Sequence, residues 1–277
     1  MTARAPHFWA DLAVRAASAA VLIPFGVGAA VLGGPWLAAA CGAASVAMAF
    51  EWARMSEPTA IDRAFAFTLA GALGAILFAA AGALREGLVW LALAALASGL
   101  RRRTLVGFIE AAGGAVYIGA PCAVFMTLRG LAPEGLAVIL FLFAVIWSAD
   151  SAAYLGGSVL KGPRVHAALS PQKTWSGLIC GTLAGAAGGT AFALWSGAGP
   201  AWAWAAAGAA LAVVGLAGDL FESLLKRRFG VKDASGLIPG HGGVLDRIDG
   251  LMLATLALGA ALALAPGLIA AFPDIGG

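Results

Sequence analysis

Long runs of apolar residues divide this chain into segments that are each about as long as a lipid bilayer is thick. Of its 277 residues, 61% are hydrophobic and only 11% are charged, and the mean hydropathy is +0.93. Soluble domains carry roughly 25% charged residues, and about 20 apolar residues in a helix cross the hydrocarbon core. No polar stretch is long enough to bury a core of its own. The sequence therefore predicts an all-α, polytopic membrane protein with one integral-membrane domain over residues 1–277.

Nine apolar segments fit the length of a membrane span when short segments with interfacial ends are included. The fourth is short enough to be re-entrant. Residues 1–140 carry no clear chemical motif, whereas residues 141–277 carry two long polar loops at 150–174 and 218–250, and we expect the functional site there. The expected spans are 16–33, 35–50, 64–84, 87–99, 112–128, 134–149, 175–195, 200–217 and 251–272.

Basic residues are distributed unequally between the two sides that these spans define. With the N-terminus in the cytoplasm, 15 of the 17 Lys and Arg residues fall in cytoplasmic segments, and only Arg85 and Arg129 fall on the other side. Cytoplasmic loops of membrane proteins carry such an excess, so the net charge of +3 does not indicate a nucleic-acid partner. The pattern predicts a multi-pass protein of the inner (cell) membrane whose N-terminus and long loops face the cytoplasm.

The second long loop concentrates both signs of charge. Ten charged residues lie between positions 219 and 249, five acidic and five basic. If the preceding helix continues into this loop, Asp219, Glu222 and Lys226 lie on one face, since residues three, four and seven apart do so. Asp246 and Asp249 are three apart and point the same way on a helical turn. Such carboxylates can converge on one or two Mg²⁺ ions, which prefer hard oxygen ligands.

Glycines and cations in the same loop suit a phosphate ligand. The run Pro239–Gly243 lets backbone N–H groups approach an anion closely. Lys226, Arg227 and Arg247 can neutralise phosphates. By itself the basic run 226–228 is typical of an anionic-lipid contact or a topology signal. The combination of carboxylates, cations and glycines favours a site for nucleotide phosphates.

The first long loop carries a weaker pattern. Asp150 ends an apolar span, where ionisable groups are costly and usually functional, and Tyr154 lies four residues on and shares its face. The run Ser170–Thr174 offers Lys173 and hydroxyl groups, with the positive end of the following helix, to a phosphate. The hydroxyls of that run equally suit ordinary helix capping.

Gly181, Gly185 and Gly189 recur at four-residue spacing within the seventh expected span. Small residues at this spacing let two membrane helices approach closely. We therefore expect this face to pack against another helix and to have no chemical role.

The segment from Ser223 to Asp249 resembles the signature of the phosphatidate cytidylyltransferases, or CDP-diacylglycerol synthases. The runs that begin at Asp150 and at Ser170 resemble the same family, and Glu51 at the end of the second span is a further match. The matching positions of the signature are Ser223, Lys226, Arg227, Lys232, Asp233, Ser235, the Ile238–Gly243 run, Asp246, Arg247 and Asp249.

The chain departs from the family pattern at two positions of the first loop. Gln172 stands where the family often has Lys, and Ser176 where it often has Glu. These differences remove one cation and one carboxylate from the loop but leave Lys173 in place.

The resemblance implies that CTP and phosphatidate react to give CDP-diacylglycerol and pyrophosphate, with Mg²⁺ required and a second cation left open. The implied partners are CTP, phosphatidate and membrane lipids, with no nucleic acid and with a homodimer left open. The lipid phosphate is already anionic, so the site mainly screens repulsion and aligns the reactants. The expected roles are catalytic for Lys173, Lys226, Asp246 and Arg247, metal-binding for Asp219, Asp246 and Asp249, and substrate-binding for Asp150, Tyr154, Ser170, Thr174, Ser223, Arg227, Lys232, His241, Gly242 and Gly243.

Three other functions are compatible with a membrane protein of this composition. A CTP-dependent lipid-alcohol kinase is disfavoured by the charged run up to Asp249. A CDP-alcohol phosphotransferase is disfavoured because Leu-Met-Leu-Ala follows Asp249-Gly250, where that class has Asp-Gly-x2-Ala-Arg. A transporter, from a different functional class, would place polar groups near the middle of its spans, whereas the charges here gather at one membrane face.

Overall fold

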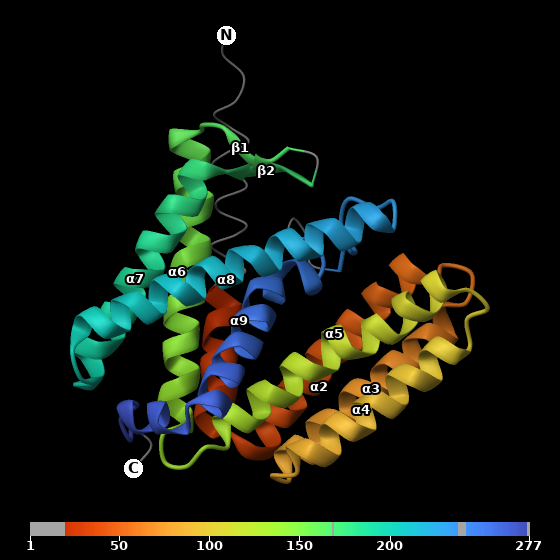
Figure 1. Ribbon diagram of the computed structural model, residues 1–277, viewed down its shortest axis with the longest axis horizontal. Helices are drawn as coiled ribbons and strands as arrows, with labels where there is room; N and C mark the ends of the chain where they lie inside the picture. The colour runs from red at the N-terminus through yellow and green to blue at the C-terminus, as the bar shows by residue number, and fades with distance from the viewer. Residues whose placement is uncertain (1–19, 168, 238–241, 276–277) are drawn as a thin grey trace.

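The structure, a computed structural model, is a bundle of tilted helices, and it describes residues 20–167, 169–237 and 242–275 (Figure 1). Helices α2 to α5 pack on one another, and so do α6 to α9. The elements are α2 (Gly34–Ser56), α3 (Ile61–Ala80), α4 (Leu84–Leu100), α5 (Leu105–Arg129), α6 (Gly135–Leu160), β1 (Arg164–His166), β2 (Ser170–Thr174), α7 (Trp175–Ser196), α8 (Ala201–Arg228), α9 (Leu245–Leu264) and the 3₁₀ helix η1 (Pro266–Ala271).

Seven of the described helices, α2, α3 and α5 to α9, are long and apolar enough to cross a membrane. Two shorter apolar helices, Ala20–Leu32 and the 17-residue α4, overlap the first and fourth expected spans. The prediction of an all-α, polytopic membrane protein is confirmed.

Both predicted loops are shorter than expected because helices continue into them. α6 extends to Leu160 and α8 to Arg228, so Asp150 and Asp219 lie on helical turns. The rest of the first loop forms an antiparallel hairpin of β1 and β2, which was not predicted. The predicted last span, 251–272, begins and ends too late. α9 starts six residues earlier, at Leu245, and ends at Leu264 ahead of Pro266, whose ring is incompatible with a continuing helix.

α9 lies between the two groups of helices (Figure 1). Its first part contributes Leu245 and Met252 to a buried cluster formed largely by α2 to α5. Its later part contributes Leu258 to a second cluster with α6, α7 and α8, in which Phe141 and Trp204 pack edge to face at 5.0 Å. The start of α9 is thus held by packing against both groups, and the polar residues there have defined neighbours.

The glycine face of α7 packs against α6 and α8, as its spacing predicted. A Cβ atom added at Gly181 would lie 3.1 Å from the carbonyl oxygen of Ala149 in α6. Cβ atoms added at Gly189 or at Gly208 of α8 would overlap backbone carbonyl oxygens of the facing helix. Only glycine therefore permits this separation of α7 and α8.

Replacing Gly208 tests this contact. We expect Gly208→Ala to lower the unfolding free energy by about 1–3 kcal/mol, because the added methyl forces two backbones apart. The measurement is the melting temperature of the detergent-purified protein. Gly113→Ala in α5 is the matched control, since a Cβ there meets nothing within 4 Å. Equal melting temperatures for the two variants would contradict the close contact.

Candidate active site

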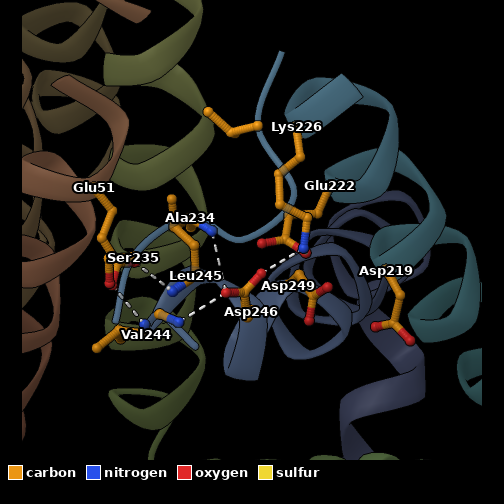
Figure 2. A network of polar contacts seen from close by, with 12 residues as sticks. Glu51, Asp219, Glu222, Lys226, Ala234, Ser235, Val244, Leu245, Asp246 and Asp249 are labelled. Carbon is orange, nitrogen blue, oxygen red and sulfur yellow. Dashed lines mark hydrogen bonds and ion pairs between the residues drawn. The ribbon is translucent and has the colours of Figure 1, made fainter. Parts of the chain in front are cut away.

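Charged side chains meet where α8 ends and α9 begins (Figure 2). The last turns of α8 present Asp219, Glu222 and Lys226, as the spacing of these residues predicted for a continuing helix. The first turn and a half of α9 presents Asp246 and Asp249. Segments separated by a polar loop in the sequence thus form one group of four carboxylates and a lysine.

Lys226 joins the two helices. Its Nζ donates a hydrogen bond to Glu222 Oε2 at 2.9 Å and forms an ion pair with Asp246. The side chains of Glu222 and Asp246 are only 4% and 9% exposed. Buried carboxylates are costly without a partner of opposite charge. This lysine therefore stabilises the fold, because its one positive charge is shared by a carboxylate of α8 and a carboxylate of α9.

Asp246 also orders the turn that precedes α9. Its Oδ2 accepts hydrogen bonds from the backbone N–H of Gly243 at 2.7 Å and of Ala234 at 3.4 Å. Gly242 has φ of +79°, and a Cβ there would lie 2.6 Å from the same oxygen. Glycine at 242 is therefore required both by its backbone conformation and by the nearby carboxylate.

Glu51, in α2, reaches the same turn from the N-terminal half of the chain. It is completely buried, and it accepts hydrogen bonds from Ser235 Oγ at 2.6 Å, Val244 N at 2.8 Å and Leu245 N at 2.9 Å (Figure 2). Its sequence neighbourhood shows none of these contacts, because its partners lie almost 200 residues away. Only the family resemblance pointed to Glu51.

The first loop contributes a second lysine. Lys173 on β2 forms an ion pair with Asp219 of α8. The Asp219 side chain lies over the start of α9, since a Cβ added at Gly250 would be 2.9 Å from its Oδ1. Asp150 lies on α6, which packs against α7 and α8. The structure therefore brings the two predicted loops together.

The carboxylate chemistry fits a divalent cation. Asp249 is 7% exposed and accepts a hydrogen bond from the N–H of Gly250 at 3.0 Å. Glu222 Oε1 and the Tyr117 hydroxyl are buried and lack hydrogen-bond partners within the described part of the chain. A carboxylate oxygen without a hydrogen-bond partner, close to further carboxylates, is a suitable ligand for a hard cation.

Lysine side chains nevertheless form ion pairs with several of these carboxylates. No group of three or more Asp, Glu, His or Cys side chains adopts a metal-binding arrangement in the ranges that the structure describes. Lys226 lies against Glu222 and Asp246, and Lys173 against Asp219. Binding of a cation by three of these groups therefore requires their side chains to move from these positions.

The other predicted residues surround this group. Thr174 caps α7 by accepting a hydrogen bond from Gly177 N at 3.2 Å, so the capping role left open by the sequence is real. Arg227 is exposed, and its guanidinium donates long bonds of 3.4 Å to carbonyl oxygens of Leu169 and Val231. Ser170 is on β2, Tyr154 on α6, Ser223 on α8 and Arg247 on α9. Lys232 is exposed in the segment after α8, and His241 lies outside the described residues.

Comparisons with known proteins show the family to which this chain belongs. Residues 13–265 match the model of the cytidylyltransferase family. The phosphatidate cytidylyltransferase of Brucella suis is 40% identical over 235 residues, which cover 84% of each chain. The protein of the same name from Bacillus subtilis is 38% identical over 148 residues, which cover 53% of this chain and 54% of the relative. With a family model that spans most of its length and a relative this similar, the chain belongs to the cytidylyltransferase family.

Proposed function

We propose that this protein transfers the cytidylyl group of CTP to phosphatidate, giving CDP-diacylglycerol and pyrophosphate for phospholipid biosynthesis. The observation that carries the proposal is the meeting of four carboxylates with Lys173 and Lys226 at one end of membrane-crossing helices. Such a group can hold both a cation and phosphates. Relatives from Brucella suis and Bacillus subtilis bear the name of this activity.

In this reaction an oxygen of the lipid phosphate attacks the α-phosphorus of CTP. The bond from that oxygen to phosphorus forms, and the bond to the oxygen that bridges to the β-phosphate breaks, so pyrophosphate leaves. The nucleophile is already anionic and gives up no proton to a protein base. Lys173, Lys226 and Arg247 would reduce the repulsion between the two anions and hold them in line.

The proposal includes a requirement for Mg²⁺. Asp219, Asp246 and Asp249 would hold it, and Glu222 Oε1, which is buried and has no hydrogen-bond partner among the described residues, lies in the same group. A bound Mg²⁺ supplies neutralisation and orientation of phosphate oxygens. The side chains of Lys173 and Lys226, released from their carboxylates, would then be available to the phosphates. A second cation and a homodimer stay predictions.

We place the protein in the inner membrane with this site facing the cytoplasm. Arg228, at the end of α8, pairs with Glu110 near the start of α5 at 3.1 Å. Arg101, which follows α4, pairs with Glu57, which follows α2, at 3.0 Å. The basic residues at the ends of α8 and α4 thus lie beside helix ends of the N-terminal group. Basic residues favour the cytoplasmic side, where CTP is present. The acyl chains of a lipid substrate can stay in the bilayer beside the helices.

Asp246→Asn tests the reaction and the role of the carboxylate group. We expect labelled CTP and phosphatidate to give CDP-diacylglycerol with the purified protein, and the variant to be slower by about 100-fold or more, as for loss of one preorganised polar group. EDTA should abolish the activity. Glu110→Gln, which removes the exposed pair with Arg228, is the control and should retain it.

Two results would count against these assignments. If the wild-type protein binds CTP but puts no label into lipid, the proposed reaction is wrong. If the wild-type protein is active and Asp246→Asn equals it, the reaction stands but the role of Asp246 is wrong.

Lys226→Gln tests whether the lysine occupies groups that a cation can use. In EDTA the variant should be less stable by on the order of 2 kcal/mol, because two buried carboxylates lose their counter-ion. Added Mg²⁺ should raise its melting temperature more than that of the wild type, since a ligand of the folded state stabilises it. An identical Mg²⁺ response in both proteins would argue against a shared location.

Cysteine labelling tests the orientation. In a variant without the three native cysteines, Lys232→Cys should react with a membrane-impermeant maleimide only after the cells are opened. Arg85→Cys, at the end of the molecule away from the site, should react in intact cells. The reverse pattern would place the site outside the cytoplasm.

A further inference from the structure

We propose that Glu51 is a positioning residue of this enzyme: from α2 it holds the start of α9 and the turn before it, and so fixes where Asp246 points. The inference rests on the proposed function, because it concerns the same site. It gives the N-terminal group of helices, which carries no motif of its own, a part in the chemistry through the position of Asp246.

The burial of Glu51 is the first observation. Its side chain has no exposed surface, and no ion pair within the described residues includes it. A carboxylate in an apolar bundle is costly unless hydrogen bonds compensate it. Here three donors do so, at 2.6 to 2.9 Å. α2 therefore keeps a charged group at a place where packing alone would favour an apolar one.

The identity of the donors is the second observation. Val244 and Leu245 supply the N–H groups at the start of α9, which have no acceptor within their own helix. α9 has no side-chain cap of its own. Glu51 thus acts as the cap from another helix, and its negative charge suits the positive end of the helix dipole.

Ser235 contacts the same carboxylate from near the middle of the connection between α8 and α9. It lies on the α8 side of the segment that links α8 to α9, and its hydroxyl donates to Glu51 Oε1. Val244 N donates to the same oxygen from the α9 side. One carboxylate oxygen therefore holds the middle of this connection to its end at α9.

Gly243 carries the effect to Asp246. A Cβ at this position would lie 2.5 Å from Glu51 Oε1, while its N–H donates to Asp246 Oδ2 at 2.7 Å. The backbone of Gly243 is thus in contact with Glu51 on one side and bonded to Asp246 on the other. If Glu51 is altered, this N–H and the first turn of α9 shift, and the Asp246 carboxylate shifts with them. Glu51 acts through Asp246 and does not itself touch substrate.

Glu51→Gln tests this role against Glu57→Gln. Both residues are buried acids near the end of α2, but Glu57 pairs with Arg101 at 3.0 Å and Arg102 at 3.1 Å, away from the turn. Gln at 51 keeps one carbonyl oxygen and presents an amide donor to a backbone N–H. A control of the same residue type at the C-terminal end of the same helix separates positioning from general loss of stability in α2.

Two readouts are measured on the full-length purified proteins. Amide hydrogen exchange at Val244 and Leu245 should be about 10-fold or more faster in Glu51→Gln than in wild type or Glu57→Gln. The Mg²⁺ concentration for half-maximal activity should rise about 10-fold or more, as for loss of an outer partner of a metal ligand. A residue that only stabilised the fold would leave this Mg²⁺ requirement unchanged in the folded fraction.

The inference is overturned if Glu51→Gln matches Glu57→Gln in exchange at positions 244 and 245 or in its Mg²⁺ requirement. If Glu51→Gln does not fold, Ser235→Ala takes its place, because it removes one of the three hydrogen bonds; it should shift both readouts in the same direction by a smaller factor, and no shift overturns the inference. A wild-type protein without cytidylyltransferase activity would refute the proposed function, while the exchange data alone would still show whether Glu51 holds α9.

Discussion

An ionised side chain inside a bundle of apolar helices is stable only where an opposite charge or a set of hydrogen-bond donors reaches it. This constraint determines the polar end of the molecule. Asp219 forms an ion pair with Lys173, and Asp246 forms one with Lys226. Glu51 accepts hydrogen bonds from backbone N–H groups and a serine hydroxyl. The groups that suit a cation and phosphates are the same groups that hold β2, α2, α8 and α9 together.

The position of α9 makes this network depend on both halves of the chain. Its first part packs with helices of the N-terminal group, and its later part with α6 to α8 (Figure 1). Asp246 consequently receives constraints from two directions, through Lys226 of α8 and through the turn that Glu51 holds. Separation of the chain into a membrane half and a chemical half describes its motifs better than it describes the contacts of its site.

The sequence predicts whatever depends on composition or on short spacing. The apolar runs predict the membrane-crossing helices, and the spacing of Asp219, Glu222 and Lys226 predicts their shared face. Hydropathy places the end of a helix where the charged residues begin. It therefore missed the final turns of α8, which stay helical although they carry charged side chains, several of them in ion pairs. The pairing of Lys226 with Asp246 and of Glu51 with Leu245 was not predictable from local pattern, because these partners lie 20 and 194 residues away. The β1–β2 hairpin was missed because it is a short polar ribbon without apolar alternation.

The cap on α9 also has a consequence for the order of synthesis. A chain leaves the ribosome N-terminus first, so α2 is made long before the N–H groups that satisfy Glu51, of which Val244 is 193 residues downstream. Until then the carboxylate lacks these donors, and because its burial without them is costly, we expect the end of α2 to reach its final packing only after α9 is made. α9 therefore completes the packing of the first half of the protein, and a chain cut short before α9 would leave Glu51 without the N–H groups of Val244 and Leu245.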